Sequence, residues 1–302
     1  MISVIQLGTV DYATGLRLQQ QLVALRKDEK IGDVLLLLEH KPVVTLGRNA
    51  KATNIVASPE LLAQQGVELF ECDRGGDVTF HGPGQLVGYP IFDLRGYSAR
   101  AENGAADASS AVHATQGTPS PSRKHLGAVD FVRRLEEVLI RACADFAIET
   151  KRIPGLTGVW TDDVALKGRD FSRAASQEID AALAAEDSHP QAKLAAIGIH
   201  ISHFVTSHGF ALNVNTDLSY FDLIVPCGIT TKPVTSMQQE LNKPLDLNAV
   251  AESISRNFGK VFSSQILWVD TLDALLGRTV GVPLKPPAEL RELHHEDDAT
   301  WA

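Results

Sequence analysis

Cysteines, long apolar runs and leader-like segments are scarce or absent in this sequence. Its 302 residues include three cysteines, Cys72, Cys143 and Cys227, with no paired spacing. An odd and widely spaced set indicates neither a disulfide framework nor a zinc site. No apolar run reaches the roughly 18 residues of a membrane-spanning helix, and residues 1–10 lack the basic flank and apolar segment of a signal peptide. The sequence therefore predicts a cytoplasmic protein without a membrane partner.

An excess of positive charge is also missing. The formal net charge is −9, whereas a protein that binds nucleic acid needs a basic surface to face the phosphates. Nucleic acid is therefore excluded as a partner. The apolar content of 44% is that of an ordinary globular protein, so a sizeable hydrophobic core is expected.

Two internal segments have little of the apolar periodicity found elsewhere. Residues 96–124 and 161–191 are rich in alanine and in polar or charged residues, and we interpret both as insertions. Within the second, a short helix is expected near 176–185. The organisation predicted is one domain over residues 1–270, interrupted by these insertions, and a C-terminal extension over 271–302.

The rest of the chain alternates between short strands and amphipathic helices. Helical spacing of apolar residues covers 12–26, 129–146 and 247–262. Short apolar runs predict strands at 2–7, 34–38, 43–46, 67–72, 86–92, 193–202 and 204–214. The two kinds of element intermix without a regular βαβ rhythm. The fold class predicted is therefore α+β, with a mixed sheet flanked by helices.

Residues 74–85 stand out between two strands that we expect to be buried. They read Arg-Gly-Gly-Asp-Val-Thr-Phe-His-Gly-Pro-Gly-Gln, and four glycines and a proline in twelve residues indicate a loop. A polar, glycine-rich loop between strands is typical of a binding site. The alternative is a tight turn with a hydrogen-bonded histidine, but the length and composition of the stretch favour the binding loop.

Cys227 is the candidate nucleophile because it lies between Pro226 and Gly228, at a predicted turn. A structural cysteine is found more often within a helix or strand, where Cys72 and Cys143 are predicted to lie. Since a free thiol is mostly protonated at neutral pH, a nucleophilic cysteine needs a basic or cationic neighbour.

Two lysines and three histidines are candidates for that neighbour. Lys193 begins a predicted buried strand, whereas Lys167 lies in polar surroundings. His81, His203 and His208 allow a Cys–His arrangement instead, and the alternative for each of them is a hydrogen-bonded loop histidine.

Five motifs, in this order, resemble those of the lipoyl(octanoyl) transferase family. They are residues 74–85, Gly158-Val159-Trp160, the Lys-Leu-Ala-Ala-Ile-Gly of 193–198, the Ser-His-Gly-Phe-Ala-Leu-Asn of 207–213, and Pro226-Cys227-Gly228. One spacing departs from the family pattern, because Lys193 lies farther from Trp160 than expected. Lys167 has nearly the expected spacing but different following residues. We favour Lys193 and treat 161–191 as inserted, since surface insertions cost little free energy.

The resemblance covers most of residues 1–270 and implies the catalytic fold of biotin and lipoate protein ligases. It implies that Cys227 takes an octanoyl group from octanoyl-acyl carrier protein as a thioester. The group then passes to a lysine of a lipoyl domain, on a 2-oxoacid dehydrogenase or the glycine cleavage H protein. Lys193 would stabilise the thiolate and serve as general base and acid. No cofactor or metal is implied, and the family is usually monomeric.

The resemblance also implies which residues line the acyl site. These are Arg74, Gly75, Gly76, Asp77, Val78, Thr79, Phe80 and His81 in the loop, Ala196, Ile197 and Gly198 after the lysine, and Gly209, Phe210 and Ala211 in the next strand. His81 would shape the pocket, and backbone N–H groups near Gly76, Gly198 or Gly209 are candidates for an oxyanion site.

Three other functions stay open at this point. An ATP-dependent lipoate or biotin protein ligase could use the same fold and would not need Cys227. A non-catalytic protein could bind acyl carrier or lipoyl domains without the chemistry. A cysteine hydrolase would release free octanoate in the absence of an amine acceptor.

The choice between the two lysines is testable by substitution. We expect Lys193→Ala to lower octanoyl transfer to a lipoyl domain by roughly a hundredfold or more, because general acid–base groups contribute on that scale. Lys167→Ala is expected to retain activity. The measurement is the rate of mass increase of the lipoyl domain. Full activity in Lys193→Ala together with loss in Lys167→Ala would reverse the assignment.

Overall fold

A computed structural model describes residues 1–98, 125–161 and 191–275 of the chain. Most of the two predicted insertions, the short helix expected near 176–185, and most of the C-terminal extension lie outside these ranges. Within them, no helix is long and apolar enough to cross a membrane.

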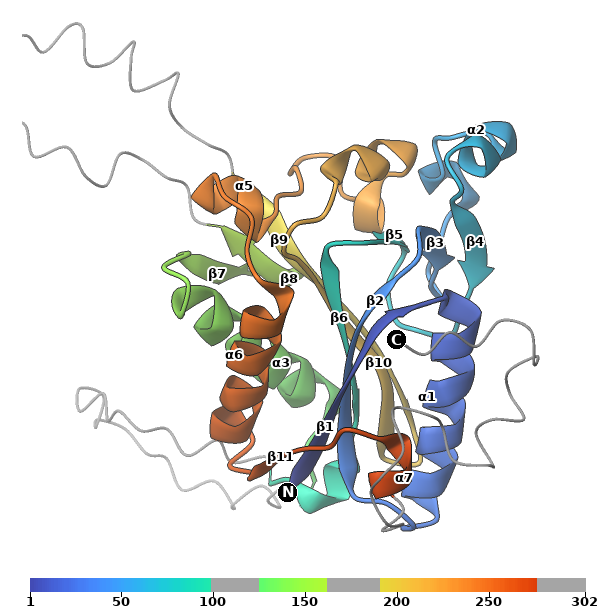
Figure 1. The fold of residues 1–302 in the computed structure, drawn as a ribbon. Helices are drawn as coiled ribbons and strands as arrows, with labels where there is room; N and C mark the ends of the chain where they lie inside the picture. Colours follow the sequence, from blue (N-terminus) through green and yellow to red (C-terminus); the bar gives the residue numbers. More distant parts are fainter. Residues whose placement is uncertain (99–124, 162–190, 276–302) are drawn as a thin grey trace, which may run out of the picture.

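A mixed eight-stranded sheet forms the centre of the molecule (Figure 1). Its strands are β1 (Ile2–Val10), β2 (Asp33–His40), β6 (Gln85–Ile91), β7 (Thr150–Ile153), β8 (Leu156–Thr161), β9 (Lys193–Ser202), β10 (Val205–Asn213) and β11 (Ile266–Trp268). They lie in the order β11-β1-β2-β6-β10-β9-β8-β7. β1 is parallel to β2 and β11, and the other pairs are antiparallel. The predicted mixed sheet is confirmed.

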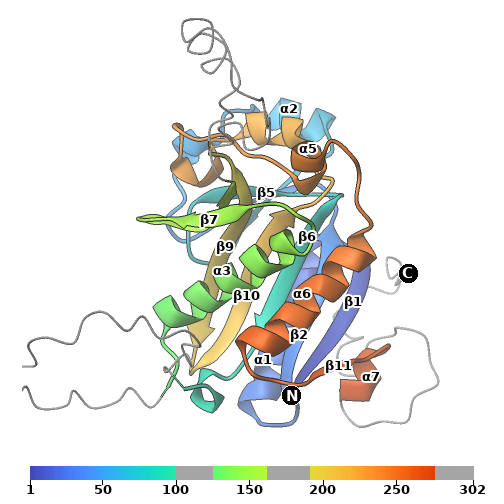
Figure 2. The same cartoon turned by 90° about the vertical axis from the view of Figure 1, so that its left-hand side faces the viewer.

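Helices cover both faces of this sheet (Figure 2). Helices α3 (Ala128–Ala144) and α6 (Leu247–Val261) pack on one face, and α1 (Tyr12–Lys27) packs on the other. The strand β2 shows why both faces need cover. Leu35 and Leu37 contribute to the core under α3 and α6, whereas Leu36 and Leu38 contribute to the core under α1. Alternate side chains of a strand point to opposite faces, so a strand buried on both sides reads as one continuous apolar run.

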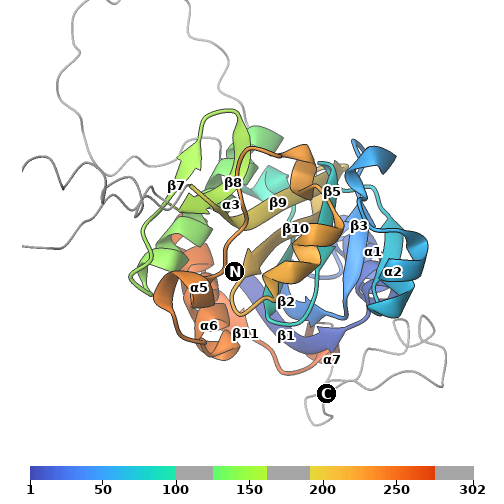
Figure 3. The same cartoon turned by 90° about the horizontal axis from the view of Figure 1, so that it is seen from above.

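A second, three-stranded sheet lies at one end of the main sheet, beside the short helix α2 (Pro59–Gln64) (Figures 1 and 3). Its order is β4 (Glu68–Glu71), β3 (Val43–Leu46) and β5 (Val78–His81). Two expectations about this region are wrong. Residues 78–81 form a strand inside the stretch predicted to be a loop, and β4, which was expected to be buried, is mostly exposed.

Short elements were missed where the sequence offers too little periodicity. Strand β7 is only partly buried throughout, and β11 has three residues, so neither shows a sustained alternation. The helix α7 (Leu272–Leu275) follows β11, and Leu272 is buried in the core under α1. The start of the predicted C-terminal extension therefore packs on the main body.

The remaining short elements connect the longer helices and strands. They are the 3-10 turns η1 (Ala52–Asn54), η2 (Leu94–Gly96), η3 (Leu218–Leu223) and η4 (Pro226–Gly228), and the helix α5 (Met237–Leu241). Turns η1 and η4 carry residues of the candidate site.

The packing of α3 supplies a matched pair of stability variants. Leu139 lies on the buried face of this helix and is fully buried, whereas Val129 near the start of the helix is 70% exposed. We expect Leu139→Ala to lower the free energy of unfolding by about 2–5 kcal/mol, because it leaves a cavity. Val129→Ala is expected to change it by less than about 0.5 kcal/mol. Urea unfolding followed by circular dichroism measures both, and equal losses would contradict this packing.

Candidate active site

Cys227 occupies a strained turn. It is the central residue of η4, and its backbone has φ 56° and ψ 20°. For a residue with a side chain, this left-handed conformation costs about 1–2 kcal/mol, so the surroundings must hold it in place. The turn is anchored just upstream, where the N–H of Val225 donates to the carbonyl oxygen of Asn54 at 2.7 Å.

Lys193 reaches the thiol from the main sheet. Its Nζ lies 3.3 Å from Sγ of Cys227, and the residue is 7% exposed. Two backbone bonds fix its position, because its N–H donates to the carbonyl oxygen of Pro233 at 2.8 Å and its carbonyl accepts from the N–H of Thr235 at 3.0 Å. The backbone of Lys193, the first residue of β9, is thus held by the segment 233–235.

The Gly-Val-Trp motif makes room for this lysine. Its ammonium nitrogen lies 5.2 Å from the centre of the Trp160 ring, a cation–π contact. A Cβ at Gly158 would lie 2.9 Å from Cε of Lys193, and Gly158 has a φ of 125°. A side chain at position 158 would therefore displace the lysine. Lys167, the competing candidate, lies outside the described residues.

A buried carboxylate supports the same region from behind. Glu136 on α3 is fully buried and accepts hydrogen bonds from Arg133 at 2.7 Å, Arg152 at 3.1 Å and the N–H of Gly158 at 3.1 Å. A buried carboxylate is tolerated only with such partners. Glu136 gives no signal in the sequence, because it looks like an ordinary charged residue of an amphipathic helix.

A narrow cavity of about 50 Å³ lies beside Cys227. One wall is formed where the glycine-rich loop lies directly on β9. The N–H of Gly75 donates to the carbonyl oxygen of Ile199 at 2.9 Å, and a Cβ at Gly198 would lie 2.5 Å from the carbonyl oxygen of Gly75. Such close approach of two backbones requires glycine at position 198.

Most of the residues predicted for the acyl site line this cavity. They are Arg74, Gly75, Gly76, Asp77, Thr79, His81, Ala196, Ile197, Gly198, Gly209, Phe210 and Ala211. Val78 and Phe80 do not. They alternate with Thr79 and His81 along β5, so their side chains face the opposite side and pack with Leu62 and Phe221.

Further residues line the cavity without having been predicted to do so. Tyr12 belongs to α1, far from the loop in the sequence, and Val87 and Tyr89 lie in β6, just after the loop. His208 had been considered only as a base. The hydroxyl oxygen of Tyr12 is buried and has no hydrogen-bond partner among the described residues. The packing of α1, β6 and β10 decides which of their side chains reach the cavity.

Arg74 fastens the loop to the small sheet. Its Nη2 donates to the backbone oxygen of Thr45 at 2.7 Å, and its Nε donates to Oγ1 of the same residue at 3.1 Å. The N–H of Arg48 donates to the carbonyl oxygen of Arg74 at 3.0 Å. The side chain is 7% exposed. Although it borders the cavity, its hydrogen bonds position the backbone of the loop.

The candidate histidine bases do not contact the thiol. His81 Nδ1 lies 2.7 Å from Oε1 of Gln85, and burial lowers the pKa of His81 to about 3. His208 Nε2 lies 2.7 Å from Oδ1 of Asp73, and burial lowers its pKa as well. His203 is exposed in the turn between β9 and β10. Lys193 is therefore the basic group at Cys227 within the described ranges.

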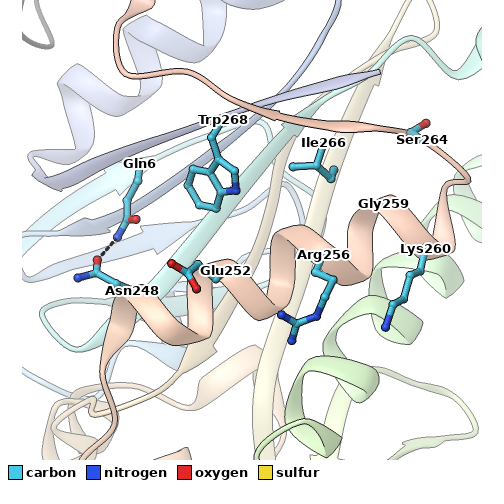
Figure 4. A pocket seen from close by; sticks show the side chains of 9 residues that line it. All are labelled: Gln6, Asn248, Glu252, Arg256, Gly259, Lys260, Ser264, Ile266 and Trp268. Carbon is cyan, nitrogen blue, oxygen red and sulfur yellow. Dashed lines mark hydrogen bonds between the residues drawn. The ribbon is translucent and has the colours of Figure 1, made fainter.

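A larger surface hollow lies elsewhere, between α6 and β11 (Figure 4). It has a volume of about 960 Å³ and is lined by Gln6, Asn248, Glu252, Arg256, Gly259, Lys260, Ser264, Ile266 and Trp268. It contains neither Cys227 nor Lys193. In the part of the chain that the structure describes, no cluster of three or more His, Cys, Asp or Glu side chains could hold a metal ion.

The fold and this site define a class of protein. The family model described as lipoyl protein ligase A/B catalytic domain matches residues 11–115 and 116–259. The octanoyltransferase of Koribacter versatilis is 53% identical over 297 residues, which cover 98% of this chain and 98% of that protein. The octanoyltransferase of Acidobacterium capsulatum is 48% identical over 278 residues, covering 91% of this chain and 96% of that protein. The chain belongs to the octanoyltransferases of this family and is an acyltransferase.

Solved structures agree on the fold. Lipoate-protein ligase A bound with ATP matches with a TM-score of 0.58 and 13% identity, covering 97% of this chain and 92% of that chain. A bipartite lipoate protein ligase from Thermoplasma acidophilum matches with a TM-score of 0.57 and 12% identity, covering 88% and 86%. At such identities the likeness concerns the fold alone, and it confirms the lipoate-ligase fold that the motifs implied.

The buried histidines predict a loss of stability in acid. Burial lowers the pKa of His81 to about 3 and that of His40 to about 4, below the value of about 6.5 in an unfolded chain. The unfolded chain therefore binds protons first, and the free energy of unfolding falls as the pH drops from about 6.5 towards 4. We expect His81→Asn to reduce this slope by up to about 1.4 kcal/mol per pH unit.

Urea unfolding over this pH range measures the slope. His203→Asn, which removes an exposed histidine, is the control and should leave it unchanged. If wild-type protein and His81→Asn lose stability in parallel, His81 is not held neutral by burial.

Proposed function

We propose that this chain transfers an octanoyl group from octanoyl-acyl carrier protein to a lysine of lipoyl domains, through a thioester on Cys227. Its relatives are octanoyltransferases, and the Thermoplasma ligase belongs to an archaeal lipoylation system together with its E2 lipoyl domain. The observation that carries the proposal is the 3.3 Å contact between Nζ of Lys193 and Sγ of Cys227 at the mouth of a narrow cavity.

The first step forms the acyl-enzyme. Lys193 accepts the proton of the Cys227 thiol, and the thiolate attacks the carbonyl carbon of the octanoyl thioester on the carrier. A new carbon–sulfur bond forms to Cys227, and the bond to the phosphopantetheine sulfur breaks. The departing thiolate takes the proton back from Lys193. One thioester replaces another, so this step needs no external energy source.

The second step forms the amide. The ε-amino group of the acceptor lysine attacks the octanoyl–cysteine carbonyl, and the Cys227 thiolate leaves. A free lysine with a pKa of about 10.4 is mostly charged in water, so the acceptor first gives one proton to solvent. Lys193 accepts the second proton as the amide forms and passes it to the departing Cys227 thiolate. Conversion of a thioester to an amide is downhill, so ATP is not required.

The cavity suits the acyl chain of such a substrate. Part of its wall consists of glycines and alanines with Phe210 and Val87, and an apolar wall of this kind favours a linear hydrocarbon. We take the backbone N–H of Gly76 as a donor to the oxyanion, because it has no hydrogen-bond partner within the described parts of the chain. The acceptors proposed are 2-oxoacid dehydrogenases and the glycine cleavage H protein.

An ATP-dependent ligase is the alternative on the same fold. A lipoate ligase of this fold has been solved with ATP bound. Ligases that activate the acid as an adenylate have no use for a thiol next to a lysine. The Lys193–Cys227 contact therefore favours the transferase.

The thioester intermediate is directly observable. We expect protein incubated with octanoyl-acyl carrier protein, without ATP, to gain the mass of one octanoyl group on Cys227. Hydroxylamine should remove it, and addition of a lipoyl domain should chase it. Intact-mass and peptide mass spectrometry measure the adduct and its position.

Two variants control this experiment. Cys227→Ala removes the nucleophile and should form no adduct, whereas Cys143→Ala removes a fully buried cysteine of α3 and should still form it. Lipoyl-domain modification that requires ATP and survives Cys227→Ala would establish the ligase instead. Rapid release of octanoate without an acceptor would establish a hydrolase.

A further inference from the structure

We propose that Asp77 and Asn54 form a clamp that holds the Cys227 turn in its left-handed conformation, and that both act as positioning residues for acyl transfer. The sequence motif had suggested that Asp77 contacts the substrate. This inference rests on the proposed thioester chemistry for its consequence, but its geometry concerns the turn itself.

The carboxylate of Asp77 is bonded on both oxygens by the protein. Oδ1 accepts from the backbone N–H of Val78 at 2.7 Å and from that of Lys51 at 3.1 Å. Oδ2 accepts from Nδ2 of Asn54 at 2.6 Å. With three donors already in place, the carboxylate serves the protein rather than a substrate. It joins the start of β5 to η1.

Asn54 carries this connection onward to the nucleophile. While its side chain binds Asp77, its backbone oxygen accepts from the N–H of Val225, two residues before Cys227, at 2.7 Å. On the other side of Cys227, the Cα of Gly228 lies against the same pair. A Cβ at Gly228 would be 2.9 Å from Oδ2 of Asp77 and 3.3 Å from Nδ2 of Asn54. The clamp therefore meets the chain on both sides of the nucleophile.

The turn needs such a hold because it is strained. Cys227 and Gly228 have φ values of 56° and 67°, and only the glycine adopts this conformation without cost. Strained residues persist where their surroundings over-determine them. Release of the clamp lets Cys227 return to an ordinary conformation, which rotates Sγ away from Nζ of Lys193.

A substitution that turns the donor of the clamp into an acceptor tests this directly. Asn54→Asp places two carboxylates face to face, and we expect single-turnover acylation of Cys227 by octanoyl-acyl carrier protein to slow about tenfold or more. The KM for the donor should change little, because Asn54 does not line the cavity. Asp77→Asn alone is expected to cost less, since the Asn54 amide can turn to offer its oxygen.

The double variant Asn54→Asp/Asp77→Asn is the decisive test of the clamp. It restores one donor facing one acceptor with the roles exchanged, and the amide oxygen introduced at position 77 can still accept from the two backbone N–H groups. We expect it to recover most of the acylation rate lost in Asn54→Asp. Failure of recovery in a folded double variant would overturn the clamp, as would a wild-type rate in Asn54→Asp.

Two additional measurements separate the clamp from general stability and from the proposed function. Asn248→Asp is the matched control, because Asn248 bonds Gln6 in the hollow between α6 and β11 and should show no effect (Figure 4). Alkylation of Cys227 by iodoacetamide needs no carrier, so the same pattern of loss and recovery supports the clamp even if no octanoyl adduct forms. Absence of the adduct in wild-type protein would defeat only the proposed function.

Discussion

The contact between Nζ of Lys193 and Sγ of Cys227 is the interaction on which the rest of the site depends. A lysine and a cysteine in water would rarely meet, and an ammonium taken out of water is costly without a partner. Here the lysine is buried, lies over the Trp160 ring, and is held at the start of β9 by two backbone bonds. The cysteine comes from a turn that the chain would not adopt by itself. The lysine from β9 and the cysteine from the turn η4 are therefore brought together by two different parts of the fold.

Burial also decides which groups in the site can titrate. His81 and His208 both border the cavity, and burial lowers the pKa of each. A histidine that stays neutral provides hydrogen bonds of fixed direction instead of charge. His81 pairs with Gln85, which in turn donates to Asn213 at 2.9 Å. These residues shape the cavity, which is consistent with the proposal that Lys193 is the acid–base group.

The same fold carries both ligation and transfer chemistry in the proteins it resembles, so the fold alone does not select between them. In this chain the proposed transfer chemistry rests on the side chains of Lys193 and Cys227. In this chain those side chains are supported by features that neither motif nor fold requires, such as the buried Glu136 behind Gly158 and the Asp77–Asn54 pair at the turn. Such supports determine how accurately a thiol and an amine are placed.

The sequence by itself determined the mixed α+β class, the main helices and the glycine-rich stretch, because periodicity and unusual local composition are readable along the chain. The candidates Cys227 and Lys193 were selected through the resemblance of their motifs to a known family. The sequence did not reveal that residues 78–81 form a strand, so it assigned Val78 and Phe80 to the cavity when β5 turns them away. It also missed Tyr12, which approaches the loop only through packing of α1, and Tyr89, because the sequence does not reveal which face of β6 borders the cavity. Only the tertiary structure decided these points, because alternation within a short strand and contacts between distant elements leave no local pattern. The 3.3 Å separation between Nζ of Lys193 and Sγ of Cys227 is likewise set by the tertiary structure.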